Sequence, residues 1–234
     1  WYYLRYTSPE VEDAVFDEDR VNYWMNVDHY IGGVEHAVMH LLYARFFMKF
    51  LQDQGLVDYR EPFSKLLTQG MVLLDGAKMS KSKGNVVDPM EILDEYGADV
   101  ARLFILFAAP PEKDLDWSNE GVEGAERFLN RVWRLVGNNL DKLKAAEAQF
   151  EVNNKLEQTL HRELHVAIRD VTADIEERDQ LNTAISSIME LVNAVYKYLN
   201  EAEEVNDGLL KEVVETIILL LAPFAPHMTE ELWA

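Results

Sequence analysis

Hydrophobic positions recur with a helical period through most of the second half of the chain. Apolar residues three and four positions apart predict helices over residues 121–145, 153–178, 181–201 and 208–222, and another that starts at Pro226. The acidic stretch from Asn200 to Gly208 predicts a loop. Successive amphipathic helices with short connections are typical of a helical bundle, because each helix buries its apolar stripe against the others.

The first half of the chain mixes short apolar runs with helical spacing. Residues 10–20 are acidic and predict a loop, whereas Val27 to Ile31, followed by Gly32-Gly33, predicts a short buried strand. From about Glu35 to Leu51 the apolar spacing is helical again. This alternation predicts a small α/β portion ahead of the bundle.

Further along, residues 66–74 form an apolar run that predicts a strand. Helices are predicted over Pro89–Tyr96 and Asp99–Ala108, with Gly97 between them. The segment Ala109–Ser118 contains Pro110-Pro111 and predicts a junction between domains. The fold class predicted for the whole chain is therefore mostly α with a small α/β portion.

Composition excludes several classes of protein. With 48% hydrophobic residues in 234 positions the chain can bury a core, and without cysteine it has neither disulfides nor a thiolate metal site. The longest apolar stretches, Leu103–Ala109 and Ile217–Ala222, are far shorter than the roughly 20 residues that a membrane span requires. We therefore expect a cytoplasmic protein with no membrane partner.

The residues with the clearest chemical meaning are Lys78-Met79-Ser80-Lys81-Ser82. Two lysines three positions apart, interleaved with hydroxyls and bracketed by Gly76 and Gly84, form a loop that can fold cations and backbone N–H groups onto a polyphosphate. A strand-like run precedes the loop, and Asp88 follows as the cap of a helix with Pro89 at its first position. Such a strand, cationic loop and capped helix predict a nucleotide site rather than a solvated surface loop.

This pentapeptide resembles the second nucleotide-binding motif of class I aminoacyl-tRNA synthetases. Within that class the chain resembles the bacterial leucyl-tRNA synthetase family, and the segments that carry the likeness are residues 26–37, 40–47, 67–73, and Gly97-Ala98-Asp99 through Pro110-Pro111. The resemblance implies the C-terminal part of a class I Rossmann-type catalytic domain over residues 1–117. An α-helical anticodon-binding domain would follow over residues 118–234, truncated at its C-terminus.

The resemblance also implies a reaction and roles for individual residues. The family activates leucine with Mg²⁺-bound ATP and transfers the leucyl group to tRNA(Leu), so ATP, leucine and tRNA(Leu) are the expected partners. Lys78 and Lys81 would be catalytic, neutralising the β- and γ-phosphates, while Met79, Ser80 and Ser82 complete the ATP-binding loop. Gly33, Glu35 and His36 would bind the adenylate, and His36 and His40 would line the leucine pocket.

One element of the family is missing from the sequence. Class I synthetases carry a His-x-Gly-His tetrapeptide near the start of the catalytic domain, and it occurs nowhere among the 234 residues. The likeness begins in the middle of that domain and stops inside the anticodon-binding domain. We therefore expect a fragment that supplies part of the ATP and leucine site and is inactive alone.

Charge leaves the RNA-binding role open. Twenty-two Lys and Arg against 42 Asp and Glu give a net charge of −20, whereas nucleic-acid binders usually carry a basic footprint. Arg127, Arg131 and Arg134 nevertheless fall at i, i+4 and i+7 of a predicted helix, so they share one face. This face either meets tRNA or is a solvated face balanced by nearby acids. DNA is not an expected partner.

Other functions are compatible with parts of the pattern. His36 and His40 have the i, i+4 spacing of zinc ligands, but no third ligand follows, so no protein-bound metal is expected. A non-catalytic helical tRNA- or protein-binding module derived from a synthetase would explain the helical half. A nucleotidyltransferase of the same superfamily would explain the lysine loop, although not the bundle after it.

Overall fold

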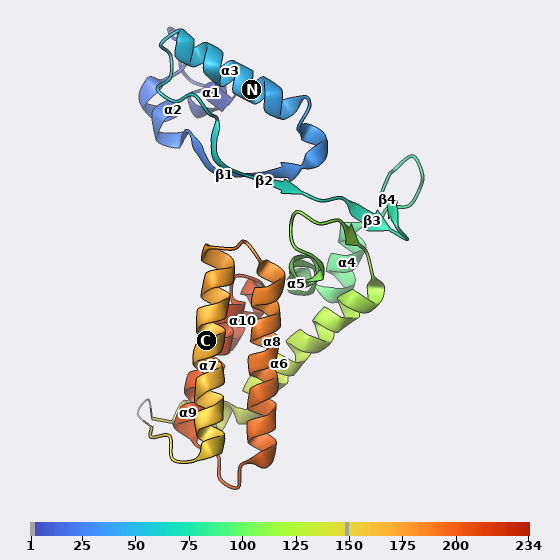
Figure 1. Cartoon of the computed structure of the whole chain (residues 1–234), viewed down its shortest axis with the longest axis vertical. Coiled ribbons are helices and arrows are strands. Elements are labelled where there is room, and N and C mark those ends of the chain that lie inside the picture. The colour runs from blue at the N-terminus through green and yellow to red at the C-terminus, as the bar shows by residue number, and fades with distance from the viewer. Residues whose placement is uncertain (1–2, 148–149) are drawn as a thin grey trace. The chain divides into compact units, whose positions relative to one another are not determined.

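The polypeptide divides into two units, which the computed structural model describes over residues 3–147 and 150–234 (Figure 1). The first unit contains the chain up to Met71 and the short segment Pro111–Asp114. The second unit contains Val72–Pro110 and Leu115–Ala234. The segment predicted to be a simple junction, Ala109–Ser118, thus contributes residues to both units.

The first unit is built on two parallel strands and the helices around them. In chain order its elements are α1 (Tyr3–Thr7), α2 (Glu18–Trp24), β1 (Val27–Gly33), a 3₁₀ turn η1 (Val34–His36), α3 (His40–Asp53) and β2 (Phe63–Gln69). Strands β1 and β2 run parallel, with Val27 opposite Phe63 and Gly33 opposite Gln69. A small core of Leu4, Phe16, Val21, Met48, Leu51 and Val57 joins the helices.

The structure corrects two predictions about the start of the chain. Residues 10–20 are not all loop, because the side chain of Asp17 accepts a hydrogen bond from Arg20 N and caps α2. Strand β1 is not buried: its residues are half-buried or exposed, and β2 is its one hydrogen-bonded neighbour among the described residues. Apolar composition alone therefore overstated its burial.

Two further predictions were wrong in their boundaries. The helix predicted from Glu35 is a 3₁₀ turn at Val34–His36, and α3 begins only at His40. The single strand predicted over residues 66–74 is broken at Gly70, where β2 has ended. A Cβ on Gly70 would lie 2.1 Å from the backbone oxygen of Lys113, so only glycine fits where these two segments of the chain approach each other.

The second unit begins with a small sheet and two helices. Strands β3 (Val72–Leu74), β4 (Ala77–Lys78) and β5 (Leu115–Asp116) form the order β4-β3-β5, antiparallel for the first pair and parallel for the second. Helices α4 (Pro89–Tyr96) and α5 (Ala98–Ala108) follow β4, separated by Gly97 at φ +85°. Asp88 caps α4 through Met90 N at 2.9 Å, as predicted.

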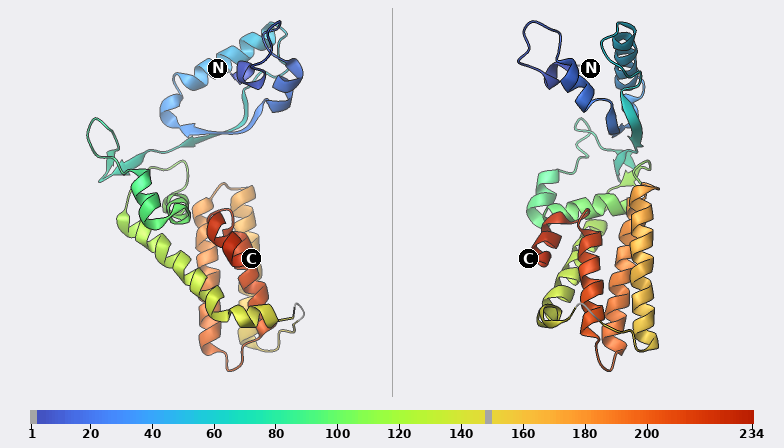
Figure 2. Two further views of the ribbon diagram at one scale, coloured as in Figure 1. Left: turned by 180° about the vertical axis from the view of Figure 1, so that it is seen from behind. Right: turned by 90° about the vertical axis from the view of Figure 1, so that its left-hand side faces the viewer.

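The remainder of the second unit is a helical bundle (Figure 2). It comprises α6 (Asn119–Ala145), α7 (Lys155–Glu176), α8 (Leu181–Glu201), α9 (Asp207–Leu221) and α10 (Pro226–Trp233), close to the predicted ranges. Their apolar stripes meet in one core that also receives residues of α4 and α5. The predicted fold class, mostly α with a small α/β portion, is confirmed.

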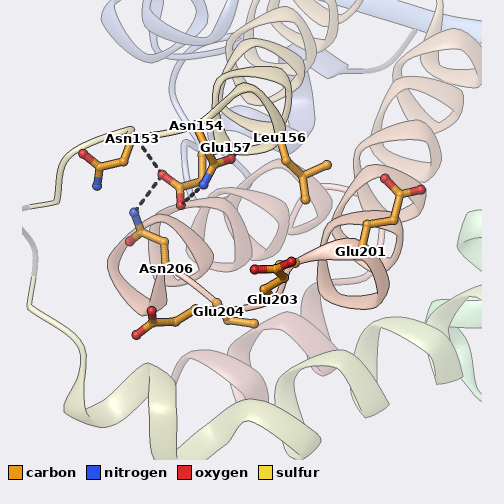
Figure 3. A pocket seen from close by; sticks show the side chains of 10 residues that line it. Asn153, Asn154, Leu156, Glu157, Glu201, Glu203, Glu204 and Asn206 are labelled. Atoms are coloured by element: carbon orange, nitrogen blue, oxygen red, sulfur yellow. Dashed lines mark hydrogen bonds between the residues drawn. The ribbon is translucent and has the colours of Figure 1, made fainter.

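A polar brace joins the starts of α7 and α9 at one end of the bundle (Figure 3). The Glu157 carboxylate is only 5% exposed and accepts hydrogen bonds from Asn153 N at 2.7 Å, Asn154 Nδ2 at 2.7 Å and Asn206 Nδ2 at 3.4 Å. Asn154 and Asn206 are themselves the N-caps of the two helices. The adjoining cavity of about 710 Å³ is lined in part by these mutually hydrogen-bonded groups and in part by Glu201, Glu203 and Glu204.

No helix in residues 3–147 or 150–234 combines the length and apolar character needed to cross a membrane.

Candidate functional site

A tight hairpin presents the lysine loop. Leu74 pairs with Ala77 across the two-residue turn Asp75-Gly76, whose φ angles are +55° and +70°. Two successive positive φ angles define a type I′ turn, which matches the twist of the flanking strands and favours Asp-Gly. Gly76 N also donates to Asp116 Oδ1 at 3.3 Å, so the tip of the hairpin is tied to β5. Lys78 lies at the end of β4, where the loop leaves the sheet.

The loop itself is folded by its own backbone. Lys83 N donates to Ser80 O at 3.0 Å, and Gly84 N donates to Lys81 O at 3.3 Å. Gly84 has φ +70°, a left-handed conformation that glycine adopts without strain. The Ser80 and Ser82 hydroxyls lie 2.8 Å apart and share a hydrogen bond. The pentapeptide is thus a compact turn with its two serines linked.

Asn85 braces this turn from the side. Its Oδ1 accepts from Ser80 N at 3.0 Å, and its Nδ2 donates to Lys78 O at 3.2 Å. One half-buried side chain therefore connects the first and third residues of the pentapeptide. Sequence reasoning missed this role, although a turn-forming Asn directly after a glycine is a local signal for it.

The lysines of the loop are available to an anion. Lys78, Lys81 and Lys83 are exposed, and none of their ammonium groups forms an ion pair with any residue that the structure describes. The stretch 78–83 thus holds three cations that form no ion pair within the described chain. They create a local positive field in a chain whose net charge is −20. This arrangement is suited to polyphosphate.

In the first unit the structure brings Gly33, His36 and His40 together around one cavity of about 340 Å³. Tyr30, Ile31 and Leu66 are among its other lining residues. The volume falls at the lower end of the range for small-molecule sites. These three predicted residues, 38 or more positions before Lys78, thus share a concave site.

Tyr30 orders the cavity and was not predicted from the sequence. Its hydroxyl hydrogen-bonds His40 Nε2, and its ring stacks on Phe63 at a centroid distance of 4.1 Å. Partial burial raises the pKa of the Tyr30 phenol above its ordinary value, so the hydroxyl stays protonated at neutral pH. The Tyr30 hydroxyl therefore fixes the ring of His40 at the cavity wall.

Glu35 lies beside this cavity rather than in its lining. A Cβ built on Gly33 would lie 2.2 Å from Glu35 Oε2, so the carboxylate folds over the backbone of Gly33. A side chain at position 33 would displace the carboxylate from this place. Gly33 and Glu35, both predicted to bind the adenylate, thus lie in contact with each other.

His36 and His40 have the i, i+4 spacing of metal ligands, but no third ligand joins them in the described part of the chain. Their ring centroids are 6.2 Å apart, and no group of three or more His, Asp or Glu within residues 3–147 and 150–234 could hold an ion.

The three arginines of α6 have different surroundings. Arg127 Nη1 lies 3.3 Å from Glu123 Oε2, an exposed i, i+4 pair that contributes little to stability. Arg131 Nη2 donates to Asn193 Oδ1 at 2.9 Å, and its guanidinium lies 5.0 Å from the centroid of the Tyr196 ring. Among the described residues, Arg134 donates only to Asn130 O on its own helix, at 3.1 Å. Arg127 and Arg131 line one cavity of about 650 Å³ among α5, α6 and α8, and Arg134 lies outside its lining.

Two protein families match parts of this chain. The family "tRNA synthetases class I (I, L, M and V)" matches residues 40–118, and the family "Anticodon-binding domain of tRNA ligase" matches residues 157–234. Leucine–tRNA ligases of Geotalea uraniireducens and Thermosipho melanesiensis are 58% and 54% identical over the whole chain. The chain belongs to the leucine–tRNA ligase family. It spans 28% of the length of each of these two relatives.

Solved structures agree with this family assignment. The Agrobacterium radiobacter K84 agnB2 LeuRS, solved as a ternary complex with tRNA and LeuAMS, is 40% identical with a TM-score of 0.88 and matches 100% of this chain with 30% of its own. The methionyl-tRNA synthetase of Mycobacterium tuberculosis, at 20% identity and a TM-score of 0.70, covers 96% of this chain with 46% of its own and shares the fold. The resemblance predicted from the sequence is thereby confirmed at the level of the family.

Proposed function

We propose that this chain is the part of a leucine–tRNA ligase that carries the second nucleotide-binding loop and the anticodon-binding region. The proposed reaction activates leucine with Mg²⁺-bound ATP and passes the leucyl group to tRNA(Leu). The observation that carries the proposal is the 54–58% identity to leucine–tRNA ligases over the whole chain, which includes the lysine loop. The solved Agrobacterium relative, a complex with tRNA and LeuAMS, supports the same partners.

In this reaction the carboxylate of leucine attacks the α-phosphate of ATP, and pyrophosphate leaves. The protein forms no bond to the substrates, so catalysis comes from positioning and from stabilising the charge that develops on the phosphates. The exposed ammonium groups of Lys78 and Lys81 would meet the β- and γ-phosphates, with Lys81 contributing more. Met79, Ser80 and Ser82 would complete the ATP-binding loop, its turn held by the hydroxyl pair and by Asn85.

The cavity of the first unit supports the other half of the proposal. The Glu35 carboxylate covers the backbone of Gly33 and would turn toward the ribose hydroxyls, from which it can accept hydrogen bonds, when the adenylate binds against Gly33. His36 would lie between adenylate and leucine, and His40 would contact the leucine side chain. The hydrogen bond from Tyr30 supports that role for His40, because it holds the imidazole in one orientation at the cavity wall.

For tRNA we propose that Arg127, Arg131 and Arg134 contact backbone phosphates from the surface of α6. The three arginines differ in their neighbours: Arg127 pairs with the acidic Glu123, while the contacts of Arg131 and Arg134 are to neutral groups.

We propose the functional boundary between catalytic and anticodon-binding parts at residues 117 and 118. The family's reaction is the reason for proposing the cytoplasm as its location.

The test uses a chimera in which this chain replaces the matched 235-residue segment of the Geotalea uraniireducens leucine–tRNA ligase. We expect leucine-dependent exchange of pyrophosphate into ATP, and charging of tRNA(Leu), at rates within about tenfold of the Geotalea enzyme. Isoleucine, valine and methionine serve as controls and should support little exchange. A folded chimera that binds tRNA(Leu) but exchanges no pyrophosphate would overturn the proposal in favour of a non-catalytic binding module.

The 234-residue chain alone is expected to be inert in the same assay. The family resemblance puts a His-x-Gly-His tetrapeptide in the nucleotide site, and the sequence contains none.

A further inference from the structure

One turn of α5 contacts both sides of the corner between α9 and α10. The carboxylate of Asp99 accepts hydrogen bonds from Met228 N at 2.7 Å and from His227 N at 3.4 Å. His227 Nδ1 lies 2.8 Å from the same carboxylate. The Asp99 side chain is 11% exposed and the His227 side chain 76%, so the backbone contacts are the better shielded part of this interaction.

Asp99 acts as a cap for a helix to which it does not belong. The N-cap residue of α10, Ala225, has no side chain that could accept a hydrogen bond, and Pro226 occupies the first turn. The free N–H groups at that end are therefore satisfied by a carboxylate from α5. A negative charge at a helix N-terminus is also favoured by the helix dipole.

Arg102, one turn further along α5, holds the other side of the corner. Its Nη2 donates to Pro223 O at 2.8 Å, and its Nε donates to Phe224 O at 3.3 Å. Both carbonyls follow the end of α9 and have no partner within that helix. A guanidinium can donate to two adjacent carbonyls at once, because its N–H groups diverge in one plane.

The corner that these two side chains hold lies partly in the core. Phe224 is 1% exposed and Ala225 is fully buried, whereas Pro223 and His227 are exposed. The contacts of Asp99 with Met228 N and of Arg102 with Phe224 O are partly buried, so these two backbone groups depend most on their side-chain partners. We call these two residues and the 223–228 backbone that they contact the α5 clamp.

The α5 clamp connects segments that belong to different family matches. Asp99 and Arg102 lie in the part that matches class I synthetases, residues 40–118, and the corner lies in the anticodon-binding match, residues 157–234. Toward the lysine loop, Gly97 joins α5 to α4, and the N-cap of α4, Asp88, lies four residues after Gly84, where the loop ends. The α5 clamp thus connects the bundle to the two helices that follow the lysine loop.

We infer that Asp99 and Arg102 are positioning residues for the transfer of leucine to tRNA, an inference that rests on the proposed function. Activation of leucine requires the lysine loop, the amino acid and ATP. Transfer also requires that a tRNA held by the bundle is fixed relative to α4 and α5, the helices that follow the lysine loop. Loosening the α5 clamp therefore slows transfer more than activation.

The test measures both reactions in the chimera with Asp99→Ala and Arg102→Ala. We expect kcat/KM for tRNA(Leu) charging to fall about tenfold in each variant, in line with the loss of one helix cap, while leucine-dependent pyrophosphate exchange stays within about twofold. The double variant should lose less than the product of the two single losses, because both residues hold one corner. Asp99→Asn keeps an acceptor for Met228 N and should recover charging to within about threefold.

A matched control separates positioning from general stability. Asn154→Ala removes the cap of α7, where Asn154 Oδ1 accepts from Glu157 N at 3.0 Å, in the same bundle but away from α5. It should lower the melting temperature about as much as Asp99→Ala and leave charging and exchange both within about twofold.

The outcomes distinguish this inference from the proposed function. A folded chimera without leucine-dependent exchange overturns both. A chimera that exchanges and charges normally, in which Asp99→Ala leaves charging intact or reduces exchange as much as charging, overturns the clamp alone. An Asn154→Ala variant that loses charging as strongly as Asp99→Ala also overturns it, because any destabilisation of the bundle would then suffice.

Discussion

Replacing Asn85 with alanine tests whether the lysine loop works as a preformed turn. Asn85→Ala removes the acceptor for Ser80 N and the donor to Lys78 O, at 3.0 and 3.2 Å. No lysine and no residue of the pentapeptide is changed. Any loss of activity would therefore come from the conformation of the loop rather than from its charge.

The size of the effect follows from the two hydrogen bonds. A neutral hydrogen bond contributes about 0.5–1.5 kcal/mol net, so two contribute about 1–3 kcal/mol. Lys78 is exposed and Ser80 and Asn85 are half-buried, so water replaces part of what is lost and the lower half of this range applies. A cost of about 1–2 kcal/mol for the closed turn corresponds to a decrease of about 5- to 30-fold in kcat/KM for ATP.

The assay is leucine-dependent pyrophosphate exchange by the chimera, measured at several ATP concentrations. Val86→Ala is the matched control, because Val86 is the next residue, its side chain is 45% exposed, and it makes no hydrogen bond through that side chain. We expect the control to stay within about twofold of the parent. If Asn85→Ala also stays within twofold, the brace has no part in activation and the reasoning is refuted.

Three further predictions concern the whole chain, the three arginines of α6, and Gly70, which lies against the backbone of Lys113. The isolated 234-residue chain should give a strongly helical circular dichroism spectrum and no leucine-dependent exchange above a blank; exchange above the blank would contradict the proposed division of the nucleotide site. In the chimera, Arg127→Ala, Arg131→Ala and Arg134→Ala should leave exchange intact, raise KM for tRNA(Leu), and each reduce the slope of log affinity against log salt by about one; unchanged slopes in all three would remove their RNA role. Arg131→Ala should also lower the melting temperature, since its guanidinium packs on an aromatic ring. Gly70→Ala should destabilise the chimera by about 1–3 kcal/mol in urea unfolding, because the added Cβ would lie 2.1 Å from backbone. Gly32→Ala is the control, because a Cβ there meets nothing within 4 Å. Equal losses of stability in the two variants would show that position 70 tolerates a side chain.

Local signals in the sequence were enough to locate the long helices. The predicted helix over residues 181–201 has the bounds of α8, and Pro226 begins α10 as predicted. Each of these helices carries its own apolar period. Helices α6, α7 and α9 also begin next to a capping side chain, whereas α8 and α10 do not. Strand β1 was harder, because burial of a strand depends on neighbours elsewhere in the chain, and its predicted burial was wrong.

Part of the candidate site could be proposed from the sequence. Short motifs and the family resemblance identified Lys78 to Ser82, Gly33, Glu35, His36 and His40 as candidates, and the structure brings Gly33 and the two histidines around one cavity. Tyr30 could not be identified from the sequence, because its contact with His40 depends on how the chain turns between β1 and the start of α3. The α5 clamp joins residues up to 129 positions apart, and no local pattern announces such a contact.

We propose that the lysine loop stabilises the charge that develops on the phosphates of ATP. The decisive comparison is Lys81→Ala with Lys83→Ala in the chimera, because both lysines are exposed in the same turn and only Lys81 belongs to the pentapeptide. We expect Lys81→Ala to lower kcat for leucine-dependent exchange about 100- to 1,000-fold, corresponding to about 2.7–4 kcal/mol, with KM for leucine nearly unchanged. Lys83→Ala should remain within about threefold of the parent. An unchanged kcat for Lys81→Ala, or equal losses in the two variants, would contradict the claim.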